Sequence, residues 1–180
     1  MWLMDEDLLR DNVPMTKFEV RAIAVAMLDI KKGDVLLDIG AGTGSISIQA
    51  NLLGAEVIAI ERDPVAYELI KRNCKKLGGK IKLIFGYALD FLDGINFNKC
   101  FLGGSGGKLV ELCEKIHANL PAGGIIVANF IKLENQCHFM EFLKSHDYKF
   151  HVSLVNVSRL DNKGLLKAEN PVFMVRGEKR

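Results

Sequence analysis

Residues 35–45 read VLLDIGAGTGS, and this stretch decides which fold the chain can adopt. Its first half is a short apolar run typical of a buried strand, and its second half places three glycines before a helix candidate. Glycine lets the backbone turn sharply and approach a bound molecule closely. Because open α/β sheets bind ligands at the carboxyl ends of their strands, the stretch predicts a strand, a ligand-binding turn and a helix.

The rest of the chain continues this alternation of strand and helix. Strands are predicted over residues 35–39, 56–60, 81–85, 99–102, 125–130, 151–157 and 171–175. Helices are predicted over residues 45–53, 64–77, 108–119 and 134–145. This pattern indicates an α/β fold with a mostly parallel seven-stranded sheet. Only residues 159–169 separate the last two strands, which is too short for a helical crossover, so we expect an antiparallel C-terminal strand.

Length and composition fit one domain over residues 1–180. The net charge of +2 does not provide the broad positive field that nucleic-acid binding usually needs. The four cysteines are scattered without a C-x-x-C pair, which argues against a zinc site and is typical of a reducing cytoplasm. No apolar run approaches the roughly 18 residues of a membrane span. We therefore expect a cytoplasmic protein with no metal, no membrane segment and no nucleic-acid partner.

The order of residues in the first turn distinguishes between cofactors. A dinucleotide fingerprint has the form G-x-G-x-x-G, whereas here the third glycine, Gly44, comes one residue early. The lysine of a P-loop is absent as well. Asp38, just ahead of the glycines, is unsuited to a pyrophosphate but suits the ammonium of a methionine moiety, directly or through water. The turn therefore predicts binding of S-adenosylmethionine.

Two further turns follow the next two strands. Glu61 ends the second strand, where a carboxylate can accept hydrogen bonds from both hydroxyls of a ribose. The alternative for Glu61 is a solvated acid that opens the next helix. The third strand leads into residues 86–90, where an adenine contact can come from the backbone, from stacking on Tyr87 or from Asp90. Simple packing of Tyr87 is the other interpretation.

A helix is predicted over residues 16–30, ahead of the first strand. Thr16 is placed to cap this helix, and Glu19 occupies the matching position of a capping box. We interpret residues 1–32 as an N-terminal helical arm over the ligand cleft. The alternative is a helix that only packs against the sheet.

A second glycine-rich turn, GGSGG at residues 103–107, follows the fourth strand. Enzymes that methylate exocyclic amines of bases usually carry Asn/Asp-Pro-Pro-aromatic here, and that motif is missing. Bare backbone amides and Ser105 ahead of a helix are suited to carboxylates. A flexible turn without a ligand is the alternative.

Several short blocks of the sequence resemble the decarboxylating precorrin methyltransferases of cobalamin biosynthesis. They are residues 14–21, 38–45, 103–107, 133–135, 157–159 and 170–172. The resemblance covers nearly the whole chain and implies a Rossmann-like, class I S-adenosylmethionine-dependent methyltransferase that assembles as a homotetramer. It also implies methylation of carbon 15 of a precorrin or cobalt-precorrin, with loss of carbon dioxide from the ring C acetate. Two positions depart from the family, since Tyr87 replaces a usual acid and Lys132 a common threonine.

The motifs and the resemblance together assign residues to the two ligands. The predicted cofactor contacts are Thr16, Asp38, Gly40, Ala41, Gly42, Thr43, Gly44, Glu61, Arg62, Gly86, Tyr87 and Ala88. The predicted contacts to the polycarboxylate substrate are Lys17, Arg21, Gly103, Gly104, Ser105, Gly106, Lys132 and Arg159. We hypothesise that no single residue is an indispensable base, because the conjugated macrocycle can itself accept the electrons that decarboxylation releases.

Two other functions remain open from the sequence. An RNA methyltransferase acting on a ring nitrogen would not need the missing amine motif, but the small net charge counts against it. A non-catalytic nucleotide-binding subunit would keep the glycine turn and lose the reaction. The intact combination of Asp38, three glycines and Glu61 argues against such a loss.

Overall fold

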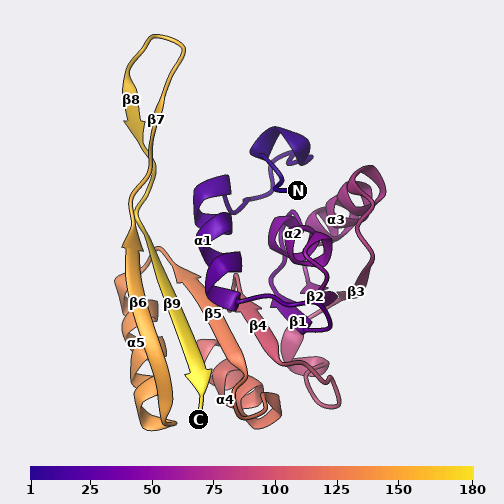
Figure 1. Ribbon diagram of the computed structural model, residues 1–180, viewed down its shortest axis with the longest axis vertical. Helices are drawn as coiled ribbons and strands as arrows, with labels where there is room; N and C mark the ends of the chain where they lie inside the picture. Colours follow the sequence, from indigo (N-terminus) through magenta and orange to yellow (C-terminus); the bar gives the residue numbers. More distant parts are fainter.

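The computed structural model describes residues 1–180, which form a seven-stranded sheet covered by helices (Figure 1). The strands are β1 (Val35–Ile39), β2 (Glu56–Glu61), β3 (Ile81–Phe85), β4 (Lys99–Leu102), β5 (Ile125–Phe130), β6 (Tyr148–Val155) and β9 (Val172–Lys179). Their order in the sheet is β3-β2-β1-β4-β5-β9-β6. Only β9 is antiparallel to its neighbours, β5 and β6. The predicted α/β fold with an antiparallel C-terminal strand is confirmed.

Helices cover both faces of the sheet. They are α1 (Phe18–Leu28), α2 (Ser45–Leu52), α3 (Pro64–Leu77), α4 (Leu109–Asn119) and α5 (Leu133–Ser145). Successive residues of a strand point to opposite faces. Leu36 and Phe101 accordingly share a core with α1 and α2, whereas Leu37 and Cys100 join the core beneath α4 and α5. Burial on both faces explains why these strands are continuous apolar runs.

The N-terminal arm differs in detail from the prediction. It contains a short turn of 3-10 helix, η1 (Asp5–Asp7), and α1 then begins at Phe18. Lys17 occupies the N-cap position and no side chain caps the helix, so the predicted capping box at Thr16 and Glu19 is wrong. The Glu19 carboxylate instead binds Arg159, which lies far along the chain.

A hairpin of β7 (Ser158–Leu160) and β8 (Leu166–Ala168) follows β6 and was not predicted from the sequence. Figure 1 shows it projecting well beyond the sheet. The strands on either side are also shifted from prediction, because β6 and β9 pair continuously from Tyr148↔Lys179 to Val155↔Val172. No helix in the protein combines the length and the apolar character that crossing a bilayer would take.

Candidate active site

A cleft of about 1170 Å³ lies at the carboxyl ends of the parallel strands. The turns after β1, β2, β3 and β4 line it, and residues 12–17 of the N-terminal arm lie along its edge. The ends of β5, β6 and β9 line the opposite side. Ligand pockets usually measure about 300–1,000 Å³. The cleft therefore has room for a cofactor and for part of a larger substrate.

The two glycine-rich turns touch each other within this cleft. Gly40 has a φ of +70°, and a Cβ added to it would lie 3.0 Å from the backbone nitrogen of Gly104. A Cβ on Gly103 would similarly lie 3.0 Å from the carbonyl oxygen of Gly40. Only glycine permits so close an approach of two backbones. Gly103 and Gly104 therefore have a structural reason to be glycine, in addition to any contact with a substrate.

Asp38 presents an unsatisfied carboxylate oxygen beside the cleft. The residue is buried, and the Ser47 hydroxyl donates a hydrogen bond to its Oδ2, whereas Oδ1 has no hydrogen-bond partner. Burial, with a smaller effect of the negative charge of Glu61, raises the pKa of Asp38 to about 7. Buried polar atoms are nearly always hydrogen-bonded. The free Oδ1 therefore marks a position for a donor on a ligand, and the ammonium of a methionine moiety meets that requirement.

Glu61 is also buried, and its carboxylate organises the cofactor turn. Its Oε2 accepts a hydrogen bond from the Gly42 N–H at 2.8 Å, and its Oε1 accepts from the N–H groups of Arg62 and Asp63. Asp63, not Glu61, caps α3 by accepting from two N–H groups of the first turn. Glu61 is only 7% exposed, which contradicts the interpretation as a solvated acid opening the helix. A carboxylate held in this way keeps lone pairs free for ribose hydroxyls.

Arg62 and Tyr87 form the rim of the cleft on the same side. The Arg62 guanidinium lies over the Tyr87 ring, 5.4 Å from its centroid, which is a cation–π contact. Gly106 borders the same guanidinium closely, since a Cβ there would lie 2.8 Å from Nη1 of Arg62. The Tyr87 side chain is exposed, so simple packing in the core does not account for it. The ring and the guanidinium together offer a flat surface on which an adenine can stack.

The prediction that Arg21 contacts the substrate is wrong. Its side chain is fully buried and donates hydrogen bonds to the carbonyl oxygens of Leu3 and Thr16 and to the carboxylate of Asp5. Every one of these partners belongs to the N-terminal arm. Arg21 therefore holds the arm in place and is not available to a ligand.

The other three predicted cations line the cleft but differ in their partners. Lys132 forms no ion pair. Lys17 lies 3.9 Å from a carboxylate oxygen of Asp5. Arg159 is surrounded by three acids of its own chain. Of these three side chains, only Lys132 is therefore free of an acidic partner and open to a substrate carboxylate.

Most of the remaining predicted residues lie together in the cleft. On the cofactor side these are Thr16, Asp38, Gly40, Ala41, Gly42, Thr43, Glu61, Arg62, Gly86, Tyr87 and Ala88, and on the substrate side Gly103, Gly104, Ser105 and Gly106. Gly44 is the exception, because it packs behind the turn, where a Cβ would meet the Ile70 side chain at 3.1 Å. Which of these residues contact a ligand stays a prediction.

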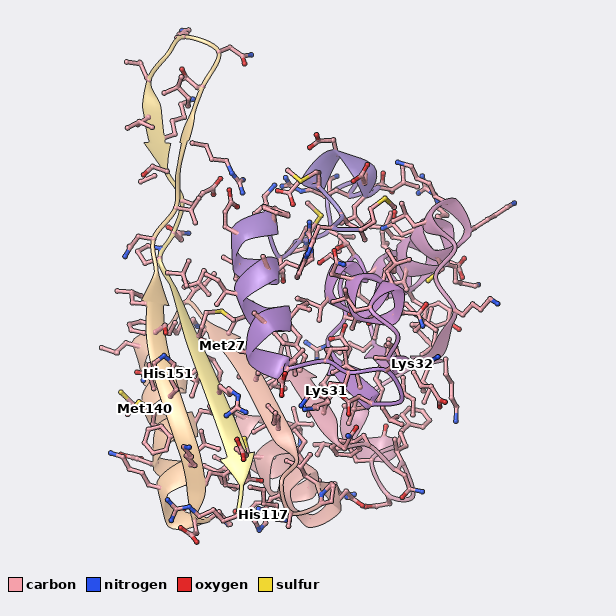
Figure 2. All side chains as sticks on the ribbon, in the orientation of Figure 1. Met27, Lys31, Lys32, His117, Met140 and His151 are labelled. Atoms are coloured by element: carbon pink, nitrogen blue, oxygen red, sulfur yellow. The ribbon has the colours of Figure 1, made fainter.

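The cleft also contains polar residues that were not among the predicted ligand contacts, namely Arg10, Asn129, Asn135 and Asn170. Asn129 is close to the end of β5, and the rule that strand ends line the ligand site points to it. Asn135 and Asn170 lie in the family-like blocks 133–135 and 170–172, whereas no local pattern indicates Arg10, which comes from the arm. No histidine lines the cleft, and His117 lies at the opposite end of the sheet, near the C-terminus (Figure 2).

The strand order, the acid ahead of the glycine turn and the second acid at the tip of β2 define a class I S-adenosylmethionine-dependent methyltransferase. A family model described as "Precorrin methyltransferase domain" matches residues 7–176. The chain therefore belongs to the precorrin methyltransferase family.

The names of individual relatives agree with this assignment to a family. A protein of Pyrobaculum aerophilum named probable cobalt-precorrin-6B C(15)-methyltransferase (decarboxylating) is 38% identical, over 95% of this chain and 92% of its own length. The cobalt-precorrin-6B C(15)-methyltransferase (decarboxylating) of Salmonella typhi is 36% identical, over 98% and 96%. The solved structure of precorrin-6y C5,15-methyltransferase from Geobacter metallireducens superposes with a TM-score of 0.94 at 31% identity, covering 99% of this chain and 97% of that one.

Proposed function

We propose that this chain transfers a methyl group from S-adenosylmethionine to carbon 15 of a precorrin-6B or cobalt-precorrin-6B macrocycle and releases the ring C acetate as carbon dioxide. This reaction belongs to cobalamin biosynthesis. The observation that carries the proposal is one continuous cleft of about 1170 Å³. It joins the Asp38 turn to side chains such as Arg10 and Lys132, which are cations without an acidic partner. The names of the relatives, which specify both the methylation and the decarboxylation, support it.

The residues of the cofactor turn fit S-adenosylmethionine. The free Oδ1 of Asp38 suits the ammonium, and the Glu61 carboxylate suits the ribose hydroxyls. The Thr43 hydroxyl is a second buried group without a partner in this turn. When bound, the cofactor supplies an electrophilic methyl group on a sulfonium. The contribution of the protein is to hold that methyl in line with the attacking carbon.

Cations without acidic partners lie on the cleft wall and suit a substrate with many carboxylates. The cleft is lined by Arg10 and Lys132, and neither of these side chains forms an ion pair or a hydrogen bond within the protein. An unpaired arginine or lysine at a cleft is an attractive partner for an acetate or propionate side chain. A neutral, apolar substrate would leave these charges unused.

Decarboxylation requires little from the side chains of this cleft. When the bond between the acetate methylene and its carboxylate breaks, the electron pair passes into the conjugated macrocycle, which is the substrate itself. Phe130, Ile131 and Val157 give the β5–β6 side of the cleft an apolar character. A carboxylate held in such surroundings loses hydration, which favours its conversion into neutral carbon dioxide.

Mass spectrometry on the purified protein tests the proposed function. Incubation with S-adenosylmethionine and cobalt-precorrin-6B should give a product that has gained one methyl group and lost one carbon dioxide. Transfer of the methyl to a tRNA instead, or cofactor binding with no product from the macrocycle, would contradict the proposal. The family match favours neither the RNA methyltransferase nor the non-catalytic subunit.

We further propose that the protein is a homotetramer in which the β7–β8 hairpin contacts another copy. Leu160 and Leu166 face each other in the register of the hairpin and are 68% and 70% exposed, and Leu165 is exposed beside them. An isolated two-stranded hairpin is only marginally stable in water. Exposed leucines on a hairpin that projects from the body are suited to a partner surface.

Replacing Leu160 and Leu166 with serine is expected to convert the tetramer into smaller species, because the change removes apolar area from the intersubunit contact. Analytical ultracentrifugation of the wild type and the double variant measures this. Val110→Ser, which changes an exposed apolar residue of α4, is the matched control and should leave the mass unchanged. A monomeric wild type, or a tetrameric double variant, would refute the proposed assembly.

We also propose that the protein acts in the cytoplasm. Its four cysteines are all free, and Cys100 and Cys113 are buried. Burial raises the pKa of the Cys113 thiol to about 12, so this thiol stays protonated and unreactive. Free, protonated thiols are typical of proteins in a reducing compartment.

A further inference from the structure

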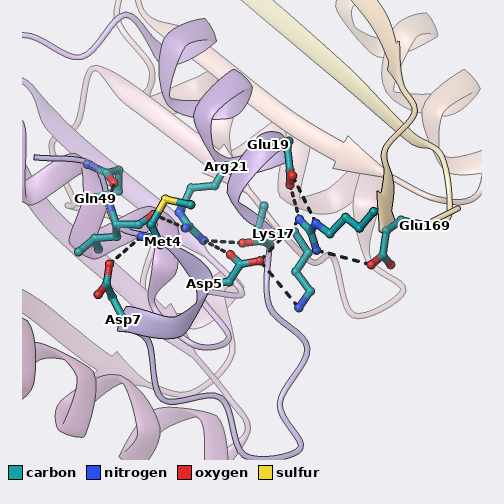
Figure 3. A network of polar contacts seen from close by, with 11 residues as sticks. Met4, Asp5, Asp7, Lys17, Glu19, Arg21, Gln49 and Glu169 are labelled. Atoms are coloured by element: carbon teal, nitrogen blue, oxygen red, sulfur yellow. Dashed lines mark hydrogen bonds and ion pairs between the residues drawn. The ribbon is translucent and has the colours of Figure 1, made fainter. Parts of the chain in front are cut away.

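A cluster of charged side chains joins the N-terminal arm to the base of the β7–β8 hairpin (Figure 3). Arg159 of β7 is at its centre. The guanidinium binds the Glu19 carboxylate through Nε, at 3.3 Å, and through Nη2. It also lies 3.6 Å from Oδ2 of Asp5 and 3.6 Å from Oε1 of Glu169. Two of these three acids, Asp5 and Glu19, belong to the N-terminal arm.

The charges of this cluster balance. This balance argues against a role of Arg159 in binding substrate carboxylates and favours a role in joining the hairpin to the arm. Three cations, Lys17, Arg21 and Arg159, meet three acids, Asp5, Glu19 and Glu169. A neutral cluster exerts little net attraction on a substrate carboxylate. Because acids of its own chain already surround the guanidinium, Arg159 is suited to joining two segments that are 140 residues apart.

The arm that Arg159 holds lies directly on the cofactor turn. The carbonyl oxygen of Pro14 is 3.1 Å from the position that a Cβ on Gly42 would occupy. The path of the arm is fixed from within by Arg21, which donates to the carbonyl oxygens of Thr16 at 2.8 Å and of Leu3 at 2.6 Å. A displacement of residues 12–17 would open the cleft beside this turn.

We propose that Arg159 is a positioning residue that keeps the N-terminal arm closed over the cofactor turn by pairing with Glu19 and Asp5. The proposal rests on the proposed function only in taking S-adenosylmethionine as the ligand of that turn. In this role Arg159 contacts neither cofactor nor macrocycle. It acts through the arm, which covers the bound cofactor and limits the access of water to it.

Replacing Arg159 with glutamine tests this role. We expect the Kd for S-adenosylmethionine, measured by calorimetry, to rise about fivefold, because the closed arm loses a partly exposed ion-pair network. Hydrogen exchange of residues 3–17 should become faster at the same time. In turnover, the KM for the cofactor should rise while kcat at saturating cofactor stays within about twofold. Arg159→Lys should give an intermediate Kd, because lysine keeps the charge but not the planar fork.

A double-mutant cycle with Glu19→Gln distinguishes the loss of the Arg159–Glu19 ion pair from a general loss of structure. The double variant should bind the cofactor no more weakly than Arg159→Gln alone, because both changes break the same pair. Arg180→Gln is the matched control, since Arg180 pairs with Asp147 far from the cleft and its loss should change nothing. If Arg159→Gln does not fold, the Kd and the hydrogen exchange of Glu19→Gln and Arg159→Lys are compared with those of the wild type instead.

An unchanged Kd and unchanged exchange in Arg159→Gln would overturn the proposal, as would two single losses that simply add in the double variant. Binding and exchange are measured without the macrocycle. A failure of carbon 15 methylation would therefore refute the proposed function and leave this inference standing.

Discussion

Replacing Asp38 with asparagine is expected to weaken the binding of S-adenosylmethionine by about 10- to 100-fold, because a hydrogen bond to a charged group contributes about 1.5–3 kcal/mol. Asparagine has nearly the same shape and can still accept the hydrogen bond from Ser47. It cannot supply the negative charge that the ammonium needs at the unpartnered Oδ1 position. Calorimetry on the folded variant measures the effect.

The same carboxyl makes cofactor binding depend on pH. In the free protein burial raises the pKa of Asp38 to about 7, so the carboxyl is largely protonated below that value. The ammonium binds the ionised form, and the affinity should therefore fall about tenfold per pH unit below pH 7. It should fall again above about pH 8, where the α-amine of the cofactor loses its proton. The Asp38→Asn variant should show no slope below about pH 7. An equal affinity at pH 6 and pH 8 in the wild type would contradict this assignment.

Asp38 makes the stability of the fold depend on pH in the opposite direction to cofactor binding. Its pKa in the folded protein lies above the ordinary value of an aspartate, so the folded state binds the proton more tightly than the unfolded state does. The free energy of unfolding should therefore decrease as the pH rises from about 4 through 7, since the buried carboxyl must then ionise. Asp38→Asn should remove this decrease and unfold at a higher temperature than the wild type at pH 8, as thermal unfolding followed by circular dichroism can show.

Replacing Gly40 with alanine is expected to destabilise the fold by about 2–4 kcal/mol and to abolish measurable cofactor binding. Two effects combine at this position. A φ of +70° disfavours any side chain, and the new Cβ would lie 3.0 Å from the backbone nitrogen of Gly104. Backbone cannot rotate away as a side chain can, so the two glycine turns would have to move apart.

Gly78→Ala provides the matched control for this prediction. Gly78 has a φ of +76°, close to that of Gly40, but nothing lies within 4 Å of the position of its Cβ. Its replacement should lower the free energy of unfolding by only about 1 kcal/mol, because a side chain disfavours the positive φ. The cofactor affinity should be unchanged. Urea unfolding measures the free energy of unfolding of both variants. The difference between their losses is the cost of the contact between the new Cβ and the Gly104 backbone. Equal losses in the two would show that the contact between the turns contributes nothing.

The cofactor half of the cleft was predictable because its signals are local. The acid, the glycines and the following helix are contiguous in the sequence, and Glu61 comes one helix and one strand later. Strands that are short apolar runs between turns were also predicted with their observed bounds, as for β1, β3, β4 and β5. Periodicity and turn chemistry suffice wherever the structure depends on neighbouring residues.

The other half of the cleft was less predictable because it is assembled from distant segments. Glu19 matched a capping box, but the N-cap of α1 lies one residue later than predicted, at Lys17, and the Glu19 carboxylate pairs with Arg159 instead. Arg21 fell in a family-like block near Lys17, yet only the fold of the arm shows that it is buried. No local pattern distinguishes a cation that meets a substrate from one that meets an acid of its own chain.

A crystal structure grown with S-adenosylmethionine would test the central claim most directly. We expect the amine of the cofactor within hydrogen-bond distance of Asp38 Oδ1, the ribose hydroxyls on the Glu61 carboxylate and the arm closed over both. A cofactor bound at another site, or one in this cleft whose amine does not meet Asp38, would contradict the account.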